Sequence, residues 1–101
     1  MMQPPEQHFI VDRLAVVDRQ VERLVQQAKT INARLELFAM LRFIYKELQE
    51  RPLQFGDPAY HTKKDGGVVC HRVIASIVVH FVVFEIDKVV CILKIAALKS
   101  L

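Results

Sequence analysis

The sequence predicts an α+β domain in which a short strand and two helices precede a three-stranded antiparallel sheet. In the first half of the chain, apolar residues recur at steps of three and four, the period of a helix packed on one side. The second half contains runs of Val, Ile and Phe separated by very short turns, which indicates strands. A length of 101 residues is typical of one domain, so we assign 1–101 to a single unit.

The first half begins with "HFIVDRL" (His8–Leu14), which predicts a short strand. The segment 16–31 that follows has one apolar face and predicts the first helix. Asn32 is a suitable N-cap for a second helix over 33–51, and Pro52 disfavours helix at the residue before it. A short turn between these helices makes a helical hairpin. The apolar face of the second helix consists of Leu37, Leu41, Ile44 and Leu48.

The second half begins with an irregular connection, "RPLQFGDPAYHTKKDGG", in which "GDP" and "DGG" are turn signals. Three strands are predicted after it, with hairpin turns near residues 75–76 and 86–88. Turns this short leave no room for helical crossovers, so neighbouring strands must be antiparallel. The predicted strands are Val68–Ala75, Ile77–Glu85 and Val89–Ala97.

The apolar run from Val73 to Phe84 raises the question of a membrane span. It has only twelve residues, whereas a spanning helix needs about twenty, and His80 interrupts it. We therefore expect no membrane segment. Cys70 and Cys91 lie in apolar runs without a Cys-x-x-Cys spacing, which predicts buried free thiols in a reducing compartment. No signal-peptide pattern begins the chain, so the expected location is the cytoplasm.

The formal charge of +3 is unevenly distributed along the chain. Residues 1–60 hold eight Lys/Arg and eight Asp/Glu, whereas residues 61–101 hold six and three, so the whole excess lies in the second part. This distribution permits a nucleic-acid partner. It is equally compatible with a solvated surface.

Strand alternation gives a predicted register and two predicted faces of the sheet. A turn at 75–76 pairs His71 with His80, and a turn at 86–87 pairs Val79 with Lys94. The face with both histidines is expected to lie under the helices, and the other face is expected to be open. That open face would expose an apolar row suited to a protein partner or to a homodimer. The predicted partner-binding residues are Ile77, Val79, Phe81, Val83 and Ile92.

Several polar residues of the second half are candidate site residues. Arg72 and Lys94 could contact a phosphate backbone from the open face, or could simply reach water at its rim. His80 could be a general base, part of a metal pair with His71, or a hydrogen-bonded residue in the sheet. Two histidines without a third ligand are a weak zinc site, so no metal is expected. No phosphate loop or other cofactor motif is present, and we expect no cofactor.

Lys63 and Lys64, in the turn "HTKKDGG", are adjacent cations in a loop that precedes the first strand of the sheet. They could contact nucleic-acid phosphates together with Arg72. A solvated loop is the alternative interpretation of such a pair.

The order strand, two helices, three strands resembles the RelE/ParE superfamily of toxins from type II toxin–antitoxin systems. "LRFIYKELQERPLQFGDPAY" resembles the second helix of that family with the connection into the sheet. "FVVFEIDKVVCILKIAAL" resembles its last hairpin, in which a short acidic-basic turn joins two Val/Ile strands. The resemblance covers most of the chain and rests on pattern, because no diagnostic motif is present.

This resemblance implies a small cytoplasmic toxin of a plasmid-stabilisation type, bound by a cognate antitoxin. RelE-type members cut messenger RNA on the ribosome without a metal, and ParE-type members act on DNA gyrase. The matching basic strand residues are Arg72 and Lys94, which with His80 make the candidate catalytic set. The chain departs from the family at "KIAALKSL", which lacks a Tyr or His after the last strand. An inactive toxin-fold protein that only binds partners is therefore the alternative.

Overall fold

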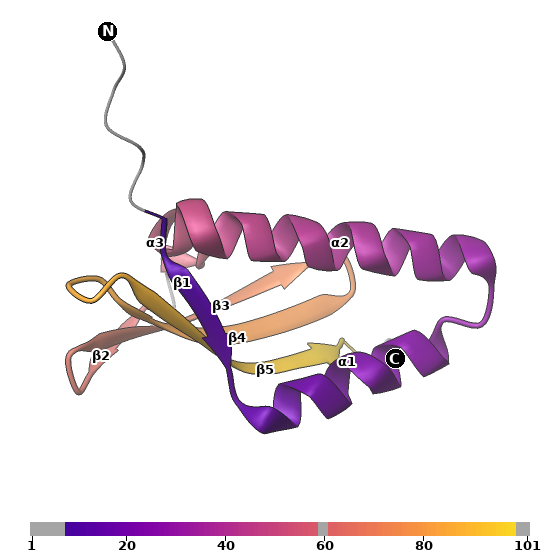
Figure 1. The fold of residues 1–101 in the computed structure, drawn as a ribbon, viewed down its shortest axis with the longest axis horizontal. Coiled ribbons are helices and arrows are strands. Elements are labelled where there is room, and N and C mark those ends of the chain that lie inside the picture. The colour runs from indigo at the N-terminus through magenta and orange to yellow at the C-terminus, as the bar shows by residue number, and fades with distance from the viewer. Residues whose placement is uncertain (1–7, 59–60, 99–101) are drawn as a thin grey trace, which may run out of the picture.

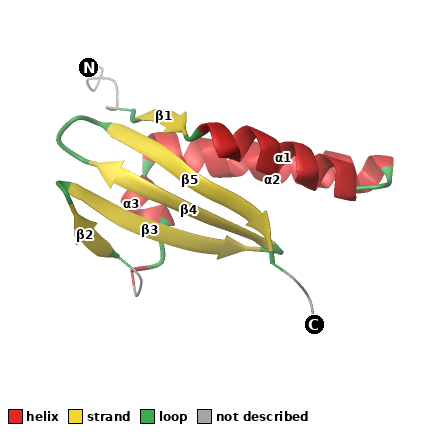
Figure 2. Cartoon of the chain, turned by 90° about the horizontal axis from the view of Figure 1, so that it is seen from below, coloured by secondary structure: helices red, strands yellow, loops and turns green. Residues whose placement is uncertain are grey.

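The chain folds into a five-stranded sheet that carries its helices on one side (Figures 1 and 2). The structure, a computed structural model, describes residues 8–58 and 61–98. The strand order across the sheet is β1-β5-β4-β3-β2. In chain order the elements are β1 (Ile10–Arg13), α1 (Ala15–Gln27), α2 (Ile31–Glu50), α3 (Pro52–Phe55), β2 (Thr62–Lys64), β3 (Gly67–Ile74), β4 (Ile77–Phe84) and β5 (Val89–Ala97).

The predicted α+β class and the predicted order of strand, helical hairpin and meander are confirmed. The first strand pairs with the last, parallel to it, from Ile10 opposite Val89 to Arg13 opposite Ile92. Beyond β1 the edge of β5 is covered by α1, because the backbone N–H of Ile95 donates to Gln20 Oε1 at 2.8 Å. The predicted first strand, β1, is therefore an edge strand of the sheet that the three later strands form.

The boundaries of the helices differ from the predicted ones. The first helix ends at Gln27 and not at residue 31, and the second begins at Ile31. Asn32 is not the N-cap, since Thr30 has the extended backbone of a cap and its Oγ1 accepts from Ala33 N at 3.0 Å. Both Thr30 and Asn32 have capping side chains, and the apolar periodicity does not distinguish between starts two residues apart.

Two short elements were not predicted. The helix α3 follows directly from α2, with Pro52 at its first position, where a missing N–H is harmless. Strand β2 pairs antiparallel with the start of β3 and turns the "HTKKDGG" segment into a hairpin. Asp65 and Gly66 take positive φ angles in its turn. Elements of three and four residues are too short to show a period, which is why the sequence pattern does not reveal them.

The β3–β4 hairpin has the predicted register, with His71 opposite His80 and Ile74 opposite Ile77. In β4–β5 the predicted register holds from Phe84 to Phe81 and then shifts by one residue. Phe81 pairs with Ile92, but His80 pairs with Lys94, so Leu93 is an extra residue on β5. This is a β-bulge. The predicted pairing of Val79 with Lys94 is therefore wrong, and Val79 pairs with Ile95.

The assignment of the two faces was also wrong. The row that was expected to be open forms the hydrophobic core beneath α1 and α2, where each of its residues is at most 3% exposed. The helices contribute Val17, Leu24, Leu37, Ile44 and Leu48 to the same core. When this face is buried, the imidazoles of His71 and His80 stay near water on the other face. The desolvation penalty is smaller than it would be if both histidines were in the core. The residues wrongly expected to bind a partner are Ile77, Val79, Phe81, Val83 and Ile92.

Candidate functional site

The side of the sheet away from the helices is the open face (Figure 2). Strand alternation and the bulge bring three groups that can carry positive charge to its middle. Apolar side chains lie on either side of them. On β3, β4 and β5 the open face includes Val69, His71, Val73, Val78, His80, Val82, Phe84, Val89, Cys91, Leu93, Lys94 and Ala96. Asp12 of β1 and Thr62 of β2 lie on the same face, opposite Cys91 and Val69.

The three polar residues, which we call the cationic cluster, are His71, His80 and Lys94. The two imidazole rings lie 5.3 Å apart between their centres and are tilted by 36°. Lys94 is directly opposite His80 on the neighbouring strand, and its side chain is exposed. Directly opposed residues have Cβ atoms about 4.5–5.5 Å apart, so the ammonium group can reach the histidine rings.

The environment of His80 lowers its pKa below the ordinary histidine value. The first cause is partial burial in the sheet, followed by the positive charges of His71 and Lys94. A neutral imidazole is therefore favoured at His80 near neutral pH, and a neutral imidazole can accept a proton.

An apolar hollow of about 520 Å³ adjoins the cationic cluster. Its nearest lining residues, Val69, Val82 and Leu93, lie one or two residues along their strands from the cluster, whereas Phe84 lies four residues from His80. Two of its lining residues pack closely over Gly67, where an added Cβ would come within 2.7 Å of Val82 and 2.9 Å of the Phe84 ring. Two residues along a strand span roughly 6.6 Å, so the hollow and the cluster can contact one small ligand. The hollow is lined by Thr62, Asp65, Val69, Val82, Phe84 and Leu93.

Arg72 does not belong to this site. It pairs with Val79 on the helix side of the sheet, opposite to the open face. Its guanidinium lies 5.4 Å from the centre of the Phe55 ring, and Nη1 donates to the Phe55 carbonyl at 3.3 Å. The expectation that Arg72 and Lys94 share one face was wrong, and Arg72 instead fastens α3 to the sheet.

The lysines of the β2–β3 hairpin are also not part of the cluster. Lys63 pairs with Val68, which faces the helix side of the sheet, and it lines a separate hollow of about 390 Å³ at the hairpin turns. The backbone of Lys64 belongs to β2, and its side chain lies outside the described part of the structure. Contact of these residues with nucleic acid stays a prediction.

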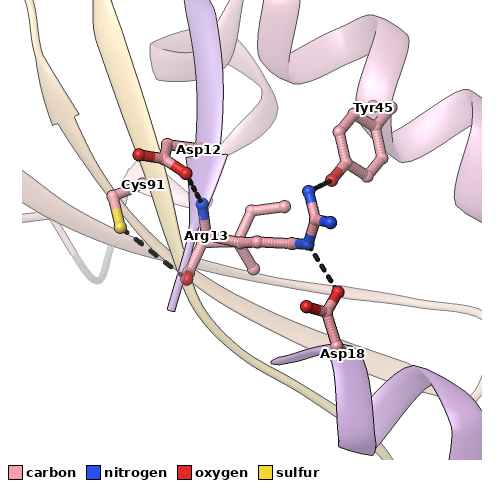
Figure 3. A network of polar contacts seen from close by, with 6 residues as sticks. Asp12, Arg13, Asp18, Tyr45 and Cys91 are labelled. Carbon is pink, nitrogen blue, oxygen red and sulfur yellow. Dashed lines mark hydrogen bonds and ion pairs between the residues drawn. The ribbon is translucent and has the colours of Figure 1, made fainter. Parts of the chain in front are cut away.

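A second polar network, which the sequence reasoning missed, joins β1 to both helices (Figure 3). Arg13 Nε donates to Asp18 Oδ1 at 2.6 Å, and Arg13 Nη1 donates to the Tyr45 hydroxyl at 3.4 Å. The hydrogen bond to Asp18 is the first cause of the raised pKa of Arg13. These residues are exposed or half-buried and tie α1 to α2, a role for which separate sequence segments give no signal.

The cysteines and the metal question can be described for residues 8–58 and 61–98. Both thiols are free, Cys70 buried and Cys91 half-buried on the open face. Burial raises the pKa of Cys70 to about 11, and burial followed by the charge of Asp12 raises that of Cys91. Within those ranges no three His, Cys, Asp or Glu side chains gather as a metal-binding group. No helix there is long and apolar enough to cross a membrane.

The fold is that of RelE-like toxins, as the sequence resemblance predicted. The chain is similar in structure to a chain of the toxin–antitoxin complex RelBE2 from Mycobacterium tuberculosis. The TM-score is 0.60 at 17% sequence identity, and the match covers 89% of this chain and 98% of that chain. No protein-family model matches the chain, and no curated protein matches its sequence. The likeness therefore establishes the fold.

Proposed function

We propose that this chain is the toxin of a bacterial toxin–antitoxin pair and that it cleaves RNA at the cationic cluster. The observation that carries the proposal is the meeting of His80 and Lys94 on the open face, produced by the bulge at Leu93. Of the three predicted catalytic residues, these two remain in the proposal, and His71 takes the place of Arg72. The RelE-like fold supports the toxin role, since the similar chain comes from a toxin–antitoxin complex.

The cluster has the groups that RNA cleavage requires. Neutral His80 takes the proton of a ribose 2′-hydroxyl, and the resulting oxygen attacks the adjacent phosphorus. The bond from phosphorus to the 5′ oxygen breaks, and that oxygen leaves with a proton from the neighbouring imidazole of His71. The products are a 2′,3′-cyclic phosphate and a free 5′-hydroxyl. Lys94 stabilises the extra negative charge of the pentavalent phosphate.

The hollow next to the cluster favours a single-stranded RNA substrate. Single-stranded RNA is bound through bases that leave the stack and lie against apolar or aromatic side chains. Val82 and Leu93 offer such a surface beside the phosphate-binding groups, and the Phe84 ring extends it along β4, four residues from His80. A base in the hollow would place its own phosphate beside the cluster.

The second candidate is a toxin-fold protein that binds a protein partner without cleaving RNA. The apolar part of the open face favours it, because Val73 is 44% exposed and lies close to the partly exposed valines of the same face. A cognate antitoxin would cover this face in either case. No feature of the described residues points to gyrase in particular.

Substitutions of the cluster test the proposal in cells and in a translation extract. Expression of the wild type without an antitoxin should arrest growth, and mapped messenger RNA should show new 5′-hydroxyl ends. His80→Gln should lower cleavage by about 10²–10⁴-fold and Lys94→Gln by about 10²–10³-fold.

Since the pKa of His80 is lowered, wild-type cleavage should persist below pH 6.5, the usual histidine value. It should decrease only when further acidification protonates His80.

Lys29→Gln is the matched control, because it removes a lysine charge at an exposed position between α1 and α2. It should cleave and arrest growth like the wild type. Arg72→Gln should leave the chemistry intact in whatever fraction stays folded. A wild type that neither arrests growth nor cleaves RNA would contradict the enzyme proposal. Recovery of a bound protein partner by that inactive chain would favour the second candidate.

A further inference from the structure

His71 and His80 form a cross-strand pair whose spacing fits a metal chelate. They lie directly opposite each other on β3 and β4, and their ring centres are 5.3 Å apart. A transition metal binds imidazole nitrogen at about 2.0–2.1 Å, and an angle of about 90–110° between two such bonds places the ring centres roughly 4.5–5.3 Å apart. The two rings can therefore bind one ion with little movement of either strand.

The backbone keeps these two side chains close together. The carbonyl of His71 accepts a hydrogen bond from Asp57 N at 2.9 Å, so the backbone polar groups of His71 point away from β4. In an antiparallel ladder this makes His71 and His80 a non-hydrogen-bonded pair, the kind in which opposed side chains are nearest. The spacing of the imidazoles is thus set by the sheet before any ion binds, which favours chelation.

An ion bound to this pair would have two protein ligands and open coordination positions. Both histidines are half-buried on the open face, on the other side of the sheet from the helices (Figure 2). No group of three His, Cys, Asp or Glu side chains gathers among the residues that the structure describes, so water would complete the coordination. Imidazole suits Ni²⁺, Cu²⁺ and Zn²⁺, whereas Mg²⁺ prefers oxygen ligands. Two ligands define a site for an exchangeable ion, since structural zinc sites use four.

We propose that His71 and His80 chelate a divalent transition metal ion and that the bound ion stops RNA cleavage at the cationic cluster. A nitrogen lone pair that binds a metal ion cannot accept a proton, so His80 no longer acts as the base. The ion and its waters also occupy the space between the two imidazoles, where the reacting phosphate would lie. The inhibition rests on the proposed function, whereas the metal binding does not.

Lys94 should affect the two activities in opposite directions. It lies opposite His80 on β5, and its ammonium group attracts a phosphate but repels a metal ion. Lys94→Gln should therefore weaken RNA cleavage and tighten Ni²⁺ binding by roughly 3–10-fold at low salt. A loss of folding would not tighten binding. Weaker Ni²⁺ binding by this variant would contradict the placement of the ion beside Lys94.

Calorimetric titration of the full chain, without an affinity tag, measures metal binding in the absence of RNA. One Ni²⁺ or Zn²⁺ ion should bind per chain, and Mg²⁺ should not bind. His71→Gln or His80→Gln should lower the affinity by about 10²-fold, because the remaining imidazole binds without the advantage of a linked second ligand. His8→Gln is the matched control, since it removes an exposed histidine outside the sheet and should bind like the wild type.

Unchanged affinity in either His71→Gln or His80→Gln, with circular dichroism showing a folded chain, would refute the chelate. Loss of binding in Cys91→Ser alone would refute it too, by assigning the ion to the thiol on the same face.

The regulatory part is tested by messenger RNA cleavage in the translation extract with and without Ni²⁺. The wild type should lose most of its activity and regain it when EDTA is added, whereas the residual activity of His71→Gln should not respond. Unchanged or faster cleavage by the metal-bound wild type would refute the inhibition. A chain that binds Ni²⁺ through both histidines but never cleaves RNA would contradict the proposed function and the inhibition, and would leave the metal site established.

Discussion

Lys94 and His80 illustrate what single residues could and could not reveal. Their candidacy followed from charge and from the unusual place of a histidine in an apolar strand. Their meeting did not, because strict alternation through Leu93 places Lys94 on the opposite face, and only a bulge that accommodates Leu93 brings Lys94 beside His80. The prediction that Arg72 lies on the same face as Lys94 was wrong for another reason. Its partner, the Phe55 ring and carbonyl, belongs to a four-residue helix that shows no period in the sequence.

The two cysteines should differ in their reactivity in the native protein. Cys70 is 1% exposed with a pKa near 11, whereas Cys91 is half-buried on the open face. Only the thiolate reacts with iodoacetamide, so Cys91 should be alkylated first at pH 8 and Cys70 only after unfolding. Mass spectrometry of digested protein measures both sites. Equal rates in the folded chain would show that Cys70 is accessible, contrary to the structure.

At the scale of elements, existence was easier to predict than boundaries. The apolar periodicity located α1 and α2 because each buries one face against the same sheet. Their ends depend on local hydrogen bonds that the periodicity does not record. The chain from Ala28 to Thr30 contains no glycine or proline to mark the turn, and two potential caps stand close together. Only the accepting Oγ1 of Thr30 decides between them.

The N-cap assignment can be tested by a pair of substitutions. Thr30→Ala removes the acceptor for Ala33 N and should lower the free energy of unfolding by about 1 kcal/mol. Asn32→Ala replaces an exposed residue of the first turn and should change it by less than about 0.5 kcal/mol. Urea denaturation followed by circular dichroism measures both. The reverse order of effects would return the helix start to Asn32.

At the scale of the whole molecule, the architecture was predictable and the orientation of its sheet was not. Short turns permit only antiparallel neighbours, and the helices must cover one face. Both faces are rich in Val and Ile, so the pattern alone left the choice to a few polar residues. Arg72 and Glu85 belong to the core face by strand alternation, which made that face the less probable core. In the structure the Arg72 guanidinium extends toward α3, and Glu85 is exposed at the end of the sheet.

Two phenylalanines of β4, three residues apart and on opposite faces, test which face is the core. Phe81 is fully buried beneath the helices, and Phe84 is half-buried on the open face. Phe81→Ala should therefore cost about 3–5 kcal/mol of unfolding free energy. Phe84→Ala should cost roughly 1 kcal/mol, since it leaves no enclosed cavity. Thermal and urea unfolding compare the two, and a larger loss at Phe84 would restore the original assignment of faces.

The bulge at Leu93 also bears on how chains of this fold can vary in length. Ile92 faces the core and Lys94 the open face, so a strand without Leu93 would alternate regularly and keep both residues where they are. Deletion of Leu93 alone would therefore leave every other residue of the sheet on the face that it now occupies. When chains of this fold are aligned, a one-residue gap at this point marks a permitted difference, and an ungapped alignment would assign the rest of β5 to the wrong faces.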